Sequence, residues 1–85
     1  MEEARTLSDL AHVRKTVGVN QSRKAVRNHR AKQVFLACDA APGITAPLAA
    51  DCQAAEIPVI QAYTMEQLGD ACSIAVGASA VAVLR

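Results

Sequence analysis

The sequence predicts an α/β fold in which helices pack around a small, largely parallel or mixed sheet. Apolar runs of strand length, such as "VFLAC" at 34–38 and "AVAVL" at 80–84, alternate with segments of helical character. The order is helix then strand, repeated four times, which is typical of an α/β sandwich. The chain has 85 residues and is 52% hydrophobic, enough for one core, so residues 1–85 are expected to form a single domain.

The first half of the chain supplies four of these elements. Residues 3–11 are expected to form a short helix, and 15–18 a short strand-like entry. A helix is predicted over 21–29, with Asn20 as its N-cap because short polar side chains accept a hydrogen bond from the first turn. The continuous apolar run at 34–38 indicates a strand buried on both faces.

The third helix and strand follow a turn. Residues 45–55 are predicted to be helical, with Pro47 tolerated in the first turn. The run "IPVI" at 57–60 indicates a second buried strand. Pro58 lacks an N–H group, so it is expected near the start of the strand or at a sheet edge.

The last helix carries a strong start signal. Thr64 and Gln67 have the spacing of a capping box, which predicts a helix that runs to about Cys72. A loop over 73–79 then leads to a final strand at 80–84.

Charge is distributed unevenly along the chain. The net charge is only +1, yet residues 11–37 contain seven Lys or Arg and no acid, whereas 39–84 contain five acids and no Lys or Arg. A basic half of this kind favours a polyanionic partner. The alternative is a solvated helix face that happens to be basic.

Several classes of protein are disfavoured. No apolar run could span a bilayer, and the acidic, amphipathic N-terminus differs from a secretory signal, so a cytoplasmic protein without a membrane partner is expected. The three cysteines form no CxxC pair, which predicts reduced thiols packed as small hydrophobes and no metal site.

Enzymatic chemistry is also not indicated. The histidines stand apart from any candidate nucleophile, and the glycines form no phosphate-binding loop, so neither catalysis nor a cofactor is expected. Phe35 and Tyr63 are the only aromatic residues, too few for a base-stacking platform.

The stretch "TVGVNQSRKAV" at 16–26 carries the best candidate site. The start of a helix suits phosphate, and Gly18 permits close backbone approach. The amides of Asn20 and Gln21 suit base edges, and Lys24 shares the helix face of Gln21, with Arg27 one turn further on. Simple helix capping by Asn20 and ordinary solvation of the other side chains remain the alternatives.

These residues belong to a longer pattern. The chain from about residue 15 to 84 resembles the ribosomal protein 7Ae/30e superfamily of kink-turn RNA-binding proteins. Its G-x-N-E/Q-x-x-K-A signature matches Gly18 to Ala25, and its A-x-D-x-x-P segment matches Ala37 to Pro42. The family's L-G-x-A-C/A segment and V-G-A loop match residues 68–72 and 76–78.

The resemblance implies a three-layer α/β/α sandwich with a four-stranded mixed sheet. It also implies an RNA partner, the kink-turn, a bent helix with sheared G·A pairs beside a bulge. Asn20 and Gln21 would bond the sheared guanines, Lys24 would reach a guanine edge or a phosphate, and Gly18 would allow close approach. The bulged nucleotides would lie against the loop residues Ile74, Ala75 and Val76.

Other cations of the basic half are predicted to contact phosphates. The candidates from the residue pattern are Arg14, Lys15, Arg27 and Lys32. At three positions the chain departs from the family: Gln21 stands where many members have glutamate and is closer to the bacterial 7Ae-like branch, Ser73 replaces a common glycine, and Ala75 replaces a polar or acidic residue.

Two functions are therefore expected. The first is a monomeric, non-enzymatic RNA-binding protein of the ribosome, for example its large subunit, or of a related ribonucleoprotein. The second is a protein-interaction module on the same fold that uses its acidic half or an exposed strand edge.

Overall fold

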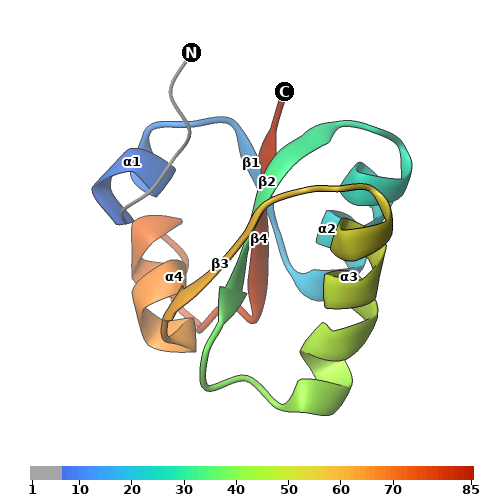
Figure 1. The fold of residues 1–85 in the computed structure, drawn as a ribbon. Helices are drawn as coiled ribbons and strands as arrows, with labels where there is room; N and C mark the ends of the chain where they lie inside the picture. The colour runs from blue at the N-terminus through green and yellow to red at the C-terminus, as the bar shows by residue number, and fades with distance from the viewer. Residues whose placement is uncertain (1–6) are drawn as a thin grey trace.

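The computed structural model describes residues 7–85 and has the predicted alternation of helices and strands (Figure 1). The predicted first helix begins at residue 3, so its first four residues lie outside the described part. The elements are α1 (Leu7–Ala11), β1 (Lys15–Val17), α2 (Val19–Arg27), β2 (Ala31–Ala37), α3 (Pro42–Ala54), β3 (Val59–Tyr63), α4 (Met65–Ala71) and β4 (Ala80–Leu84).

The strands form one mixed sheet in the order β1-β4-β2-β3. β1 and β2 are both antiparallel to β4, and β3 is parallel to β2. Helices α2 and α3 cover one face of the sheet, and α1 and α4 cover the other (Figure 1). The predicted three-layer sandwich with a four-stranded mixed sheet is confirmed.

Two apolar clusters, one on each face of the sheet, make up the core. β2 and β4 are central strands, so their alternating side chains serve both clusters. On the α2–α3 face, Leu48 and Cys52 pack against Val34. On the α1–α4 face, Leu10 and Leu68 are fully buried beside Phe35 and its neighbours.

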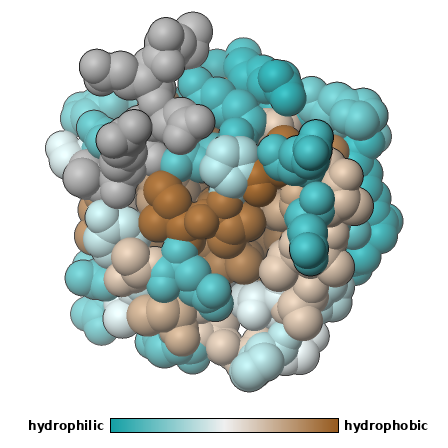
Figure 2. All heavy atoms as spheres, viewed as in Figure 1, coloured by the Kyte–Doolittle hydropathy of each residue, from teal (hydrophilic) through white to brown (hydrophobic). Residues whose placement is uncertain are grey.

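The third strand differs from its prediction. The sequence predicts a buried strand at 57–60, but β3 is an edge strand whose residues are exposed or half-buried. Pro58 precedes it, as expected, and its carbonyl accepts the Val34 N–H at 3.0 Å. Val59 is 39% exposed, and apolar side chains gather in the middle of the face that carries β3 (Figure 2). Ile57 and Ile60 are partly buried against the core, so the apolar run belongs to a half-exposed edge strand and not to a buried one.

Helix α3 also begins earlier than predicted, because Pro42 occupies its first turn. Pro47 consequently lies inside the helix and not in its first turn. A proline there removes one helical hydrogen bond. Leu48 and Cys52 lie on the buried face, as predicted, whereas Ala55 is the exposed C-cap.

Helices α2, α3 and α4 all end in the same way. The residue after each C-cap has a left-handed backbone, with φ values of 58° at His29, 57° at Glu56 and 59° at Ser73. In α2 the N–H of Arg30 donates to the carbonyl of Ala25 at 2.8 Å, and the other two helices have the equivalent bond. These are Schellman motifs, which usually place glycine at the left-handed position.

The replacement of His29 by glycine is expected to raise the free energy of unfolding by about 0.5–1 kcal/mol. A left-handed backbone costs a residue with a Cβ about 1–2 kcal/mol, and the greater freedom of glycine in the unfolded chain offsets part of the gain. Thermal or denaturant unfolding measures the change. His29→Ala is the matched control, because it removes the imidazole but keeps the strain. An equal gain from alanine would contradict the explanation.

Candidate nucleic-acid interface

The amino ends of three helices lie at one edge of the sheet, the edge formed by the ends of the strands and not by the lateral strand β3. β1, β2 and β3 run in the same direction, so the helices that follow them, α2, α3 and α4, all start at that edge, the lower end in Figure 1. β4 runs the opposite way and begins there. The Gly18 N–H donates to the Ala80 carbonyl at 2.8 Å, which fixes the start of α2 beside the loop before β4. Helix amino ends carry partial positive charge, so this edge suits an anion.

The side-chain amides of Asn20 and Gln21 take no part in capping α2. The helix begins at Val19 and its N-cap is Gly18, with φ 104° and no side-chain cap bond, so the predicted capping by Asn20 is wrong. The reason is that the Ser22 N–H donates to the Gly18 carbonyl at 2.9 Å, so the helix has already begun and Asn20 lies inside its first turn. The Asn20 and Gln21 side chains are exposed and have no hydrogen bond to any residue in 7–85.

Gln21 and Lys24 lie together beside a hollow of about 270 Å³. The lining residues are Lys15, Thr16, Gln21, Lys24, Ala25, Asn28, Arg30 and Leu84. The sequence-based site omits three of the polar ones, Thr16, Asn28 and Arg30. Asn28 could have been found from its helical spacing to Gln21 and Lys24. Arg30 lies beyond the helix, and only the Schellman turn brings it to the hollow.

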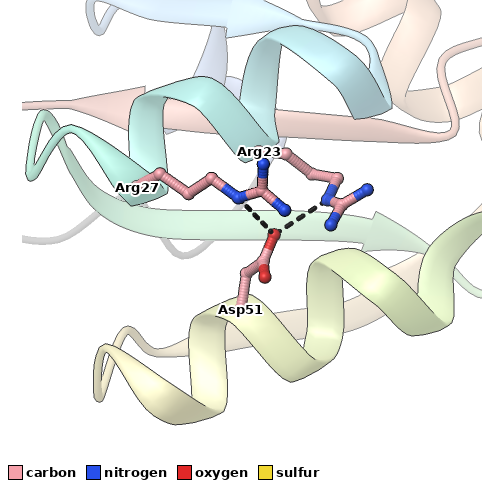
Figure 3. A network of polar contacts seen from close by, with 3 residues as sticks. All are labelled: Arg23, Arg27 and Asp51. Carbon is pink, nitrogen blue, oxygen red and sulfur yellow. Dashed lines mark hydrogen bonds and ion pairs between the residues drawn. The ribbon is translucent and has the colours of Figure 1, made fainter.

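The Arg27 side chain does not line the hollow beside Gln21 and Lys24. Figure 3 shows Arg23 and Arg27 pointing from α2 towards Asp51 on α3. Their Nε atoms lie 2.8 Å and 3.7 Å from Asp51 Oδ2. The prediction that Arg27 extends the face of Gln21 and Lys24 therefore fails: it lines a different hollow, between α2 and α3.

The other residues predicted to contact phosphates, Arg14, Lys15 and Lys32, lie in different parts of the structure. Lys15 borders the hollow, but its Nζ lies 3.5 Å from the Ala11 carbonyl and 3.4 Å from that of Val13, at the end of α1. A cation there satisfies carbonyl groups of the helix end. Arg14 is exposed, and Lys32, in β2, is half-buried.

The loop before β4 is held close to α4. A Cβ at Gly69 would collide with the carbonyl oxygen of Val76, and the Ala78 N–H donates to the Met65 carbonyl at 3.0 Å. Ile74 packs into the core, whereas Ala75 is exposed and Val76 is 72% exposed. Of the three predicted loop contacts, only these last two face outwards.

The start of α4 is fixed by side chains. Thr64 and Gln67 form the predicted capping box. Asp39, from the A-x-D-x-x-P segment, accepts the Met65 N–H at 2.8 Å. This motif residue thus holds α4, and with it the neighbouring loop, against the end of β2.

The three cysteines differ in how deeply they are buried, and burial raises the pKa of two of them. Burial, with a smaller contribution from Asp51, raises the pKa of the Cys52 thiol to about 11. Burial also raises the pKa of Cys72, against the opposing effect of Lys15. Both thiols are therefore weak nucleophiles. Cys38 is exposed, so the prediction that all three are packed inside is wrong for this residue.

Within residues 7–85, no three His, Cys, Asp or Glu side chains come together in a way that could hold a metal ion. No helix in this range combines the length and apolar character that membrane crossing requires.

Comparison with known proteins identifies the family. RNA-binding protein YbxF of Geobacillus stearothermophilus is 39% identical over 69 residues, which cover 81% of this chain and 84% of the relative. An RNA-binding protein of Bacillus pumilus is 35% identical over 68 residues, covering 80% and 83%.

Solved structures show the same fold. A Bacillus halodurans protein of unknown function has a TM-score of 0.87 at 28% identity, covering 98% of this chain and 87% of that one. The 15.5 kD RNA-binding protein of Giardia lamblia has a TM-score of 0.82 at 24% identity, covering 93% and 68%. Residues 4–85 match the family model, and the chain therefore belongs to the ribosomal protein L7Ae/L30e/S12e/Gadd45 family.

Proposed function

We propose that residues 1–85 act as one monomeric RNA-binding domain that recognises a kink-turn. Its setting would be a cytoplasmic ribonucleoprotein, with the ribosome as the first candidate. The observation that carries the proposal is the pair of exposed amides, Asn20 and Gln21, at the open amino end of α2. Two of the relatives named above are called RNA-binding proteins, which supports RNA as the partner.

The amides suit sheared G·A pairs because each offers one donor and one acceptor group. A bend in the duplex widens the groove enough to expose the guanine edges to the amino end of α2. Gly18 has no side chain, and the space where its Cβ would lie is open, so the RNA can approach the backbone there. Lys24, one turn along the helix, reaches the same groove and adds a charge-assisted bond.

The loop before β4 suits the bulge beside the bend. Val76 is exposed next to Ala75, and both lie at the sheet edge where α2 begins. An exposed apolar side chain at a polar edge can cover unstacked bases, which lose their neighbours at a bulge. Ile74 would act indirectly, by anchoring the loop to the core.

The mechanism is selection of one RNA shape. A free kink-turn RNA samples straight and bent forms, and a protein that binds only the bent form shifts the population towards it. The free energy available to shift the RNA population is the difference between the free energies with which the protein binds the bent and the straight form. Contact with about four to six phosphates would give a slope of about −3 to −4 for log K against log salt.

The test is a titration of the protein into a fluorescent kink-turn RNA and into the same RNA with Watson–Crick pairs in place of its G·A pairs. We expect tight binding to the first RNA only, with the salt slope given above. Equal binding to both RNAs would mean a basic surface without shape selectivity. Affinity that ignores salt would also contradict the proposal.

A protein partner at the β3 edge is the second candidate function. The edge strand is exposed or half-buried, lies in the acidic half of the chain and includes Val59, which is 39% exposed. Apolar side chains gather in the middle of this face of the molecule (Figure 2). An exposed strand edge can pair with a strand from another protein. Purified protein that carries no nucleic acid and ignores heparin would favour this function.

A further inference from the structure

Helix α2 and the turn after it carry four cations in two different environments. Arg23 and Arg27 share the carboxylate of Asp51. Lys24 and Arg30 line the hollow on the other flank, and neither has a carboxylate of the described chain within ion-pair distance. The first pair is partly neutralised by Asp51, whereas the second pair keeps its full charge for an anionic ligand.

The lining of this hollow suits a sugar–phosphate backbone. Thr16 and Asn28 add a hydroxyl and an amide to the two cations, and none of the described lining residues is acidic. The hollow has a volume of about 270 Å³, which leaves room for part of one backbone strand. The backbone of Arg30 is fixed at the rim of the hollow by two hydrogen bonds. Its N–H donates to the Ala25 carbonyl in α2, and its carbonyl accepts the Arg85 N–H at 2.8 Å.

The hollow is continuous with the amides at the helix start, because Gln21 and Lys24 belong to both. With a rise of 1.5 Å per residue, Asn28 lies about 10 Å from Gln21 along the helix. That length spans only a few nucleotides of a duplex arm. A strand that leaves the bend beside Gln21 is therefore guided along α2 towards Arg30.

We propose that this hollow holds the backbone of one duplex arm of the bent RNA, with Lys24 and Arg30 on nearby phosphates and Thr16 and Asn28 beside the sugars. The inference rests on the proposed function and extends its site beyond the amino end of α2. Arg30 thereby contributes affinity for the arm without reading the bend itself.

The experiment compares wild type with Arg30→Gln over a salt series, using kink-turn RNA with full arms and with each arm shortened in turn. We expect Arg30→Gln to weaken binding about three- to tenfold and to reduce the steepness of the salt slope by about 0.7–0.9, the effect of one phosphate. Arg30→Lys should keep the slope, because the slope depends on the number of phosphates neutralised and a lysine neutralises one as an arginine does. With one particular arm shortened, wild type and Arg30→Gln should bind equally.

Arg23→Gln is the matched control, since it removes the same charge from the opposite flank of α2. If Arg30→Gln behaves like Arg23→Gln, or loses the same affinity with every RNA, the inference is overturned. The proposed function fails separately, when wild-type protein does not prefer the kink-turn over its Watson–Crick counterpart. Thermal unfolding of each variant verifies that it is folded during the titration.

Discussion

Substitution of Gln21 or Lys24 by alanine is expected to weaken binding to a kink-turn RNA by about 1–3 kcal/mol each, the usual value of a base-edge contact. The Gln21 side chain is exposed and makes no hydrogen bond within residues 7–85, so its removal should leave the fold intact. Lys24 likewise has no carboxylate partner among the described residues. The loss should therefore appear in RNA affinity and not in stability.

The double variant is expected to lose less than the sum of the single ones, because the two side chains border the same hollow and share a ligand. Gln53→Ala is the matched control, since Gln53 is an exposed glutamine of a different helix, α3. Fluorescence titration measures each affinity. A Gln21→Ala variant that binds like Gln53→Ala would show that the amide makes no base contact.

Gly69→Ala should lower both stability and RNA affinity. The added Cβ would meet the Val76 carbonyl oxygen and lie 3.2 Å from the Gly77 Cα, so backbone must move. Overpacking of this kind costs about 1–3 kcal/mol, which lowers Tm by about 5–20 °C in a domain of this size. The displaced segment is the loop proposed to cover the bulge, so the bent RNA should bind more weakly at a temperature where the variant is still folded.

Gly43→Ala provides the matched control for this prediction. No atom lies within 4 Å of a Cβ at Gly43, which sits in the first turn of α3. Alanine there should be neutral or stabilise by up to about 1 kcal/mol, because it loses less entropy than glycine on folding. Equal Tm values for Gly69→Ala and wild type would contradict the packing of the loop on α4.

The central part of the fold could be predicted because its signals are local. The apolar run at 80–84 gives β4 its observed bounds, and the Thr64–Gln67 spacing gives the start of α4. The prediction of a buried strand at 57–60 is wrong because an apolar run looks the same in a buried strand and in a half-exposed edge strand. Only the order of the strands decides between them.

The candidate site was predicted only in part, for a similar reason. The family motif identifies Gly18, Asn20, Gln21 and Lys24, but it cannot tell a helix cap from a free amide. That distinction depends on the residue at which α2 begins, which is set by the bond from the Ser22 N–H to the Gly18 carbonyl and shifts by two residues from the prediction. The role of Arg27 depends on Asp51, contributed by another helix.

One measurement tests the central claim, that bent RNA binds where α2 begins, most directly: an NMR titration of isotope-labelled protein with unlabelled kink-turn RNA. We predict large shifts at the side-chain amides of Asn20 and Gln21 and at the backbone of residues 18–24 and 74–77, with little change in β3. Shifts confined to β3, or no shifts at all, would contradict RNA recognition at this edge and favour a protein partner.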